Sequence, residues 1–361
     1  QAQKPMLHNY CFPSEIRARL ARRLIEITPP KLAKAFILTT GAETTECAVK
    51  LARTHGQKVG GKKKIGIVSF QDAFHGRTMG AQQIGGSPAL KAWIVNLDPA
   101  MWQVPFPDEY LAKDVTFGGF LKALDEQGVT PDMVAGVITE TYQGGRSSFA
   151  PKQFVQDLAK WCKQHNVVLI MDEVQAGFGR TGKRFGFEHY GIVPDIICCG
   201  KGISSSLPVS AVVGRKDLMD QYPPGSMTST HTGSPVCAVA ALANIDYIWK
   251  HKLWENAAKA GDIMLAQLRK LEAKYAGRVG HVYGKGLVAA VHMVAKDGTT
   301  ADYDLAFEAV RRCMEKGLLL FSPVGAASIK IAPPLTITKS QVLDGCAVLD
   351  EAIGEALAAE K

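Results

Sequence analysis

The sequence predicts an α/β protein, in which helices cover both faces of a mostly parallel central sheet and a smaller α+β domain follows. Two observations support this fold class. Between about residues 30 and 230, short β-rich runs alternate with helical patterns. The β-rich runs are continuously apolar rather than alternating, which is typical of parallel strands that are buried on both faces.

The expected elements follow in chain order. The strands of the first region are AFILTT (35–40), KIGIVSF (64–70), MVAGVITE (133–140), VVLIMDE (167–173), DIICCG (195–200) and SAVVGR (210–215). After a loop at 226–235, two long amphipathic helices extend to about Tyr275. The strand VAAVHMV (288–294), a helix near 301–316, the strands LLLFSP (318–323) and SIKIAP (328–333) and a last helix complete the chain. Thr338 and Gln341 form a capping box for that last helix.

These elements divide the chain into three parts. We expect residues 1–29 to be the remnant of an N-terminal segment that leads into a large domain at 30–250, and residues 251–361 to form a small C-terminal domain. No apolar stretch approaches the roughly 20 residues of a spanning helix, and no signal-peptide core is visible. We therefore expect a cytoplasmic protein that does not enter a membrane.

Charge and cysteine content exclude several classes of function. The formal net charge is +8, but the run GKKK (61–64) lacks the interleaved aromatic residues of a single-strand binder, so we expect a solvated turn and no nucleic-acid partner. The eight cysteines show no CxxC pair and no histidine at zinc spacing. We interpret them as buried free thiols, with no metal site and no disulfide framework.

Polar residues end several of the predicted strands. Ligands of open parallel sheets bind beyond the carboxyl ends of the strands, where Thr40, Glu140, Asp172 and Lys201 all fall. A carboxylate and an amine at one sheet edge can hold a pyridine ring from both ends. The alternatives are a helix cap or a structural ion pair for Asp172, and a surface lysine in a glycine-rich loop for Lys201.

The segment TTGAETTECAVKLAR (39–53) places a helix start directly after a strand. Free backbone N–H groups, the Thr40 hydroxyl and the positive end of the helix dipole suit a phosphate group. Such junctions are often only tight turns, and the nucleotide signatures GxGxxG and GxxxxGK[ST] are absent. A nucleotide-binding or regulatory protein without catalysis therefore stays open as one interpretation.

Two motifs carry a family resemblance. DEVQAGFGRTG (172–182) followed by GKG (200–202) resembles the class III aminotransferases of pyridoxal-phosphate fold type I, which include ornithine, 4-aminobutyrate and dialkylglycine enzymes. The resemblance extends from about residue 10 to 355. It implies pyridoxal 5'-phosphate as cofactor, an aldimine at Lys201 that then shuttles the proton between the substrate α-carbon and C4′, and a contact between Asp172 and the pyridine nitrogen.

The resemblance also implies further cofactor contacts. Val174 and Phe74 would pack on the two ring faces, and Gln175 would bond the phenolic oxygen. The remaining residues implied are Thr40, Gly41 and Ala42 at the phosphate, His75 and Gly76 in the pocket wall, Glu140, and Thr230, which reaches the phosphate of the neighbouring subunit. A homodimer with shared active sites follows, and it could pair into a dimer of dimers.

The sequence departs from the family pattern at the substrate side. In ETYQGGRSSFAP, Gly145 replaces the glutamate that gates a substrate-carboxylate arginine, and Lys330 stands where many members carry that arginine. A lysine binds carboxylate as a point charge rather than as a fork, so Lys330 is either a substrate contact or an exposed strand lysine. We also expect that the N-terminal strands lining part of the substrate pocket are missing from these residues, and that the connection between 110 and 115 is shortened.

The predicted activity is transfer of an amino group from an amine or amino acid to a 2-oxo acid through Lys201. A racemase, a decarboxylase or an aminomutase of the same fold is the alternative, since fold and cofactor do not decide the reaction. The donor and the acceptor are not identified by the sequence.

Overall fold

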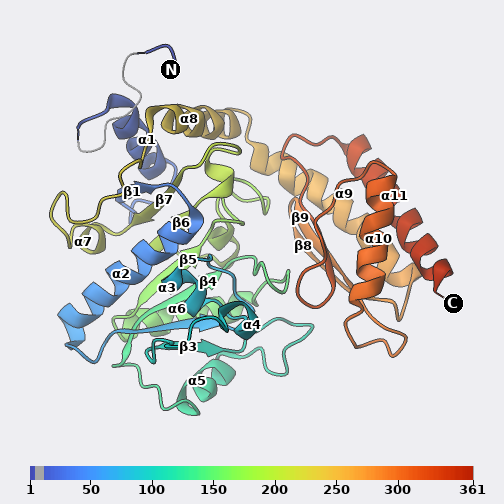
Figure 1. The fold of residues 1–361 in the computed structure, drawn as a ribbon, viewed down its shortest axis with the longest axis horizontal. Helices are drawn as coiled ribbons and strands as arrows, with labels where there is room; N and C mark the ends of the chain where they lie inside the picture. The colour runs from blue at the N-terminus through green and yellow to red at the C-terminus, as the bar shows by residue number, and fades with distance from the viewer. Residues whose placement is uncertain (5–11, 361) are drawn as a thin grey trace. The chain divides into compact units, whose positions relative to one another are not determined.

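The structure of the chain, a computed structural model, describes residues 1–4 and 12–360 (Figure 1). It separates into two compact units, each with its own core. The N-terminal unit comprises 1–141, 150–178 and 187–251, and the C-terminal unit comprises 142–149, 179–186 and 252–361. Two short segments, 142–149 and 179–186, thus group with the C-terminal unit although they precede residue 250 in the chain. Cys11, one of the expected free thiols, lies outside the described residues.

The N-terminal unit contains a seven-stranded sheet in the order β1-β7-β6-β5-β4-β2-β3. Its elements are α1 (Glu15–Glu26), β1 (Lys34–Leu38), α2 (Gly41–Gly60), β2 (Gly66–Phe70), α3 (Met79–Ile84), α4 (Pro88–Lys91), β3 (Met101–Val104), α5 (Phe117–Asp125), β4 (Val134–Glu140), α6 (Lys152–Gln164), β5 (Val168–Asp172), η1 (Gly186–Tyr190), β6 (Ile196–Cys199), η2 (Lys201–Ile203), β7 (Ser210–Gly214), α7 (Lys216–Met219) and α8 (Pro235–Lys250). The expected α/β class with a mostly parallel sheet is confirmed.

Strand direction brings the polar strand ends to one edge. β7 runs antiparallel to both β1 and β6, so β1 and β6 are parallel to each other. β4, β5 and β6 are also parallel, and Glu140 stands beside Asp172 in the register. The residues that follow β1, β4, β5 and β6 therefore emerge at the same edge of the sheet.

Both faces of this sheet are covered. Ile67 belongs to a core shared with Ala48, Leu51 and other residues of α2, whereas the ring of Phe70 lies 6.2 Å from Phe120 of α5 and 6.1 Å from Phe154 of α6. Side chains three residues apart on a strand point to opposite faces. Helix α2 therefore covers one face and α5 with α6 the other, as Figure 1 shows for α2.

The C-terminal unit is a three-stranded antiparallel sheet, in the order β10-β9-β8, packed against helices (Figure 1). Its elements are α9 (Leu253–Lys274), β8 (Val279–Lys285), β9 (Val288–Met293), α10 (Tyr303–Glu315), β10 (Ser328–Ile331) and α11 (Lys339–Ala359). The capping box of Thr338 and Gln341 at the start of α11 is confirmed.

One expected strand is wrong. Residues 318–323 (LLLFSP) form no ladder, and Leu319 and Phe321 are 80% and 69% exposed. An apolar run alone therefore does not make a strand. The sequence did not predict β8, which pairs with β9 on the side away from β10.

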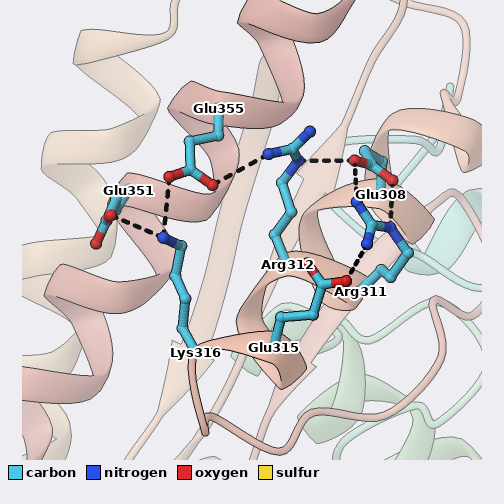
Figure 2. Close-up of polar contacts among 7 residues, drawn as sticks. All are labelled: Glu308, Arg311, Arg312, Glu315, Lys316, Glu351 and Glu355. Carbon is cyan, nitrogen blue, oxygen red and sulfur yellow. Dashed lines mark hydrogen bonds and ion pairs between the residues drawn. The ribbon is translucent and has the colours of Figure 1, made fainter.

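A surface ion network joins α10 to α11 (Figure 2). Glu308 accepts hydrogen bonds from Arg311 and from Arg312, each at 2.7 Å, and Arg312 donates to Glu355 at 3.1 Å. Lys316 then bridges Glu355 and Glu351, and Glu315 pairs with Arg311. These side chains are 22% to 61% exposed, so the network lies in solvent.

Among the described residues, no helix is both long enough and apolar enough to cross a bilayer.

Candidate active site

One cavity of about 180 Å³ lies at the polar edge of the large sheet. It is lined by Gly41, Ala42, Phe74, His75, Gly76, Glu140, Asp172, Val174, Gln175 and Lys201. All ten are residues for which the sequence predicts a cofactor contact, and all lie within the N-terminal unit. Segments separated by up to 160 positions along the chain, from Gly41 to Lys201, therefore converge on one space.

Asp172 ends β5 and is held from two sides. Its Oδ2 lies 2.8 Å from His75 Nδ1, and its Oδ1 accepts the N–H of Val174 at 3.0 Å. The carboxylate is only 5% exposed. A buried carboxylate fixed in this way keeps one orientation, with its charge directed at the cavity.

His75 is fully buried and its environment favours the charged ring. Burial would lower the pKa of His75, but the hydrogen bond and the charge of Asp172, with a contribution from Glu140, raise that pKa above its ordinary value of 6.5. Thr45 Oγ1 donates to the His75 carbonyl at 2.9 Å and fixes the backbone. Nε2 of His75 is buried and has no hydrogen-bond partner among the described residues.

Glycines leave room where side chains would intrude. Gly76 has φ of 136°, and a Cβ there would meet Ala42 Cβ at 2.5 Å. A Cβ on Gly41 would stand 3.1 Å from Val174 Cγ1. The backbone of the first turn of α2 thus approaches Val174 closely, which only glycine at position 41 permits without displacement.

The start of α2 exposes backbone N–H groups to the cavity. Thr40 caps the helix: its hydroxyl accepts the N–H of Glu43, while the Glu43 carboxylate accepts the N–H groups of Thr39 and Thr40. The first N–H groups of a helix have no partner within it. Those of Gly41 and Ala42 are therefore suited to an anion, whereas Thr40 serves as the cap and does not line the cavity.

Lys201 begins the turn after β6 in a rare backbone conformation. Its φ is 37°, in the left-handed region that non-glycine residues seldom adopt. Its side chain lines the cavity, and a Cβ on the preceding Gly200 would stand 3.3 Å from Val174 Cγ1 and 3.6 Å from the Gly41 Cα. Strain of this kind persists only where the surroundings fix it.

Phe74 and Glu140 are linked across the cavity wall. The N–H of Phe74 donates to Glu140 Oε2 at 3.0 Å, and the Arg77 guanidinium lies 5.5 Å from the centroid of the Phe74 ring. Glu140, which stands beside Asp172 in the sheet register, therefore holds the backbone of the Phe74 segment in place.

The structure adds two supporting residues that sequence reasoning missed. Glu173 is fully buried, and its Oε1 accepts from Thr141 Oγ1 at 2.6 Å and from the N–H of Phe187 at 3.0 Å. Glu46 Oε1 accepts from Thr78 Oγ1 and from the N–H groups of Gly80 and Ala81. The signal for Glu173 was its place directly after Asp172 at a buried strand end; for Glu46 the sequence carries no signal.

The two remaining predicted residues are not among those that line this cavity. Thr230 is exposed in the loop 226–234, where the neighbouring Ser229 hydroxyl donates to Glu43 Oε1 at 3.3 Å. Lys330 lies on β10 in the C-terminal unit; its Nζ donates to Gly144 O at 3.0 Å and stands 5.2 Å from the Tyr142 ring centroid.

The cavity fits pyridoxal phosphate by the chemistry of its donors. It offers a buried carboxylate for the ring nitrogen, an amine for the aldehyde and helix N–H groups for the phosphate. It also offers apolar atoms of Phe74 and Val174 for the ring faces.

Comparison with known proteins decides the family. The profile described as Aminotransferase class-III matches residues 1–353. The chain belongs to this family. It is 32% identical to 4-aminobutyrate aminotransferase of Mycobacterium leprae, over 98% of this chain and 82% of that protein. It is 34% identical to leucine/methionine racemase of Thermococcus litoralis, over 93% of this chain and 76% of the relative.

Solved structures agree with this assignment. The amine transaminase from an uncultivated Pseudomonas species, solved in its pyridoxal-phosphate-bound form, superposes with a TM-score of 0.88 at 26% identity, covering 98% of this chain and 84% of that one. The class-III family is pyridoxal-phosphate-dependent, and this member is accordingly an aminotransferase with that cofactor.

Proposed function

We propose that this class-III aminotransferase moves an amino group from an amine or amino acid to a 2-oxo acid in the cavity between Asp172 and Lys201. The observation that carries this proposal is the Asp172–His75 pair, held rigid and buried in the wall of the same cavity that Lys201 lines. Rigid placement of charge and of a proton carrier is what such a transfer requires.

When bound, pyridoxal phosphate supplies a ring that accepts electron density from the substrate carbon. The task of Asp172 is to hold a proton on the ring nitrogen, and a carboxylate oriented by His75 and by the Val174 N–H is suited to it. Protonated His75 would place a compensating positive charge beside Asp172 in the buried wall.

Lys201 would hold the cofactor through its amine. Its freed amine would carry a proton from the substrate α-carbon to the cofactor carbon C4′, which lies on the other side of the transferred nitrogen. Phe74 and Val174 would exclude water from the ring faces, and Gln175 would bond its phenolic oxygen.

We propose that the phosphate binds to the N–H groups of Gly41 and Ala42, with Thr230 of a second copy completing the site. The support is the exposed position of Thr230 and the pattern of the surrounding loop. A cytoplasmic homodimer with shared sites belongs to the same proposal.

Lys330 is proposed as a contact for a substrate carboxylate. A lysine amine carries three N–H donors, so its bond to Gly144 O is compatible with a further acceptor. Lys330→Met should then raise KM for a donor with a carboxylate and leave KM for a carboxylate-free amine unchanged. An equal change in KM for both donors would show that Lys330 does not bind the substrate carboxylate.

The activity is tested by incubating the protein and cofactor with amine and amino-acid donors against pyruvate and 2-oxoglutarate. Formation of alanine or glutamate, abolished in Lys201→Ala, is the expected result. Loss of donor without a new amino acid would contradict amino transfer.

A racemase is the second candidate, because the relative from Thermococcus litoralis at 34% identity carries that name. Racemisation moves a proton on and off one carbon and needs no acceptor. Inversion of a pure L-amino acid in the absence of any 2-oxo acid, followed by chiral chromatography, would favour this reaction over transfer.

A further inference from the structure

The turn that carries Lys201 is under conformational strain at both of its ends. Lys201 has φ of 37° and Ser205 has φ of 64°, so two non-glycine residues adopt the left-handed region within five positions. Backbone bonds close the turn: the N–H groups of Ile203 and Ser205 donate to the carbonyls of Gly200 and Lys201 at 3.0 and 3.1 Å. Bonds internal to a turn do not fix its direction relative to the sheet, and direction is what aims the Lys201 side chain.

Asn244, on helix α8, provides an anchor from outside the turn. Its Nδ2 donates to Gly202 O at 2.7 Å and to Ile203 O at 3.1 Å, and its Oδ1 accepts from Ser205 Oγ at 2.9 Å. Because the two carbonyls can only accept, the NH₂ group must be the atom that faces them. One amide therefore binds three of the four residues that follow Lys201.

We propose that Asn244 is a positioning residue that fixes the strained turn and so aims the Lys201 amine into the cavity. This inference rests on the proposed function, in which Lys201 must reach the substrate α-carbon and the cofactor carbon C4′ in turn. A displacement of about 1 Å at a reacting group can lower a rate by about 100-fold, so an anchor one residue away from Lys201 has leverage on the chemistry.

The chain contains a matched control. Asn256, on α9 in the C-terminal unit, donates through Nδ2 to Leu335 O at 2.7 Å and to Ile337 O at 3.1 Å. The type of residue, the helical setting, the two carbonyl acceptors and the distances are the same as at Asn244. The segment being held differs, because Leu335 and Ile337 neither line the cavity nor adjoin Lys201. Asn244 also accepts the Ser205 hydroxyl, and an aspartate oxygen at position 244 can still accept that bond.

The experiment compares Asn244→Asp with Asn256→Asp. An aspartate keeps the shape but turns an oxygen toward two carbonyls that can only accept, so both variants lose the same two bonds. Cofactor-free protein is mixed with pyridoxal phosphate, and attachment to Lys201, which joins its nitrogen to the aldehyde carbon with loss of water, is followed by absorbance. Borohydride reduction and peptide mapping then confirm the position. Thermal midpoints and hydrogen exchange of amides 202–205 are measured without cofactor.

We expect Asn244→Asp to slow attachment about 10- to 100-fold and to speed exchange at 202–205. Asn256→Asp should lower the thermal midpoint by a similar amount yet attach cofactor within about twofold of the wild-type rate. Asn244→Ala, which introduces no repulsion, should also slow attachment and serves if Asn244→Asp does not fold.

Three results would overturn the proposal. Attachment at the wild-type rate in both Asn244 variants removes the positioning role while leaving the proposed function intact. Equal slowing in Asn244→Asp and Asn256→Asp shows only a general loss of stability. A wild-type protein that attaches no cofactor at Lys201 contradicts the proposed function and, with it, this inference.

Discussion

The His75–Asp172 pair and the ion network of α10 and α11 use the same chemistry in opposite surroundings. In the first, His75 Nδ1 lies 2.8 Å from Asp172 Oδ2, and the side chains of His75 and Asp172 are 0% and 5% exposed. In the second, Glu308 binds two arginines, and its side chain and that of Arg311 are 32% and 52% exposed. The buried pair is shielded from bulk solvent, whereas the members of the network are partly exposed to it.

Because of this difference, contacts in the network can replace one another, whereas those of Asp172 cannot. The network offers Arg312 and Lys316 two carboxylates each, so removal of one carboxylate leaves another contact (Figure 2). Asp172 has no such substitute, and its orientation governs the cavity. Interactions between charges are strong at low dielectric. A charge held there in a fixed direction can therefore stabilise a transition state, and its loss is costly.

The largest effect should follow from removal of the buried charge itself. Asp172→Asn keeps the size of the side chain but not its charge, and we expect kcat to fall by about 10²- to 10⁴-fold. The matched control is Asp98→Asn, which breaks the partly exposed bond of 2.7 Å to Arg53 in the same unit and should leave kcat within about twofold. Steady-state kinetics at saturating cofactor measure both; equal kcat values would mean that Asp172 does not govern the chemistry.

Removal of the other partner should be costly for folding. His75→Leu leaves Asp172 buried without its hydrogen-bond partner, and we expect the free energy of unfolding at pH 6 to fall by about 3–5 kcal/mol. Urea denaturation of cofactor-free protein measures this loss. If His75→Leu cost no more than Glu308→Gln in the network, the distinction between the buried pair and the exposed network would fail.

Steric crowding at the cavity should have the next largest effect. Gly76→Ala combines the backbone strain of φ 136° with a contact of 2.5 Å to Ala42 Cβ, and a cost of about 2–4 kcal/mol is expected. Gly128→Ala is the control, because Gly128 also has positive φ, 68°, but no atom within 4 Å of a new Cβ. It should lose only the strain, about 1–2 kcal/mol; equal losses would show that Ala42 moves aside.

The buried pair should also respond to pH in a defined direction. Since the folded pKa of His75 is raised above 6.5, its charged form stabilises the fold fully below pH 6.5, and this contribution is lost as pH rises through the folded pKa. The stability difference between wild type and His75→Gln should therefore be larger at pH 6 than at pH 9. Urea midpoints at both values, without cofactor, test the sign, and a difference that grows toward pH 9 would contradict it.

The smallest effect belongs to the network. Hydrogen bonds from Arg311 and Arg312 lower the pKa of Glu308 to about 2, yet its exposure limits the gain. Glu308→Gln should cost less than about 1 kcal/mol, and the cost should shrink in high salt because exposed charges are screened. A loss above that of Gly76→Ala, or one unchanged by salt, would show that the network acts as a buried one.

The sequence predicted what local chemistry encodes. Continuous apolar runs gave the central strands correctly, and the direction of those strands carried Asp172 and Lys201 to one edge. The cavity residues were implied by family motifs, because each short motif contributes residues that meet in the same site. The edge strand β3, with Trp102 and Gln103 in four residues, lacked such a signal and was missed.

Other features depend on contacts between distant segments. Asn244 and Glu46 lie in ordinary helical sequence, and only the fold places them beside Gly202 and Thr78. The run at 318–323 was apolar enough for a strand, but Leu319 and Phe321 are exposed and the run pairs with no described strand. The Thr40 hydroxyl caps α2 by accepting the Glu43 N–H, and its predicted contact with a phosphate stays a prediction.

The central claim is that Lys201, which lines the same cavity as the Asp172–His75 pair, holds the cofactor. Its most direct test is borohydride reduction of the protein with pyridoxal phosphate, followed by digestion and mass spectrometry of the labelled peptide. We predict one label per chain, on Lys201, and the loss of that label in Lys201→Ala. Labelling at another lysine, or none in correctly folded protein, would contradict the account.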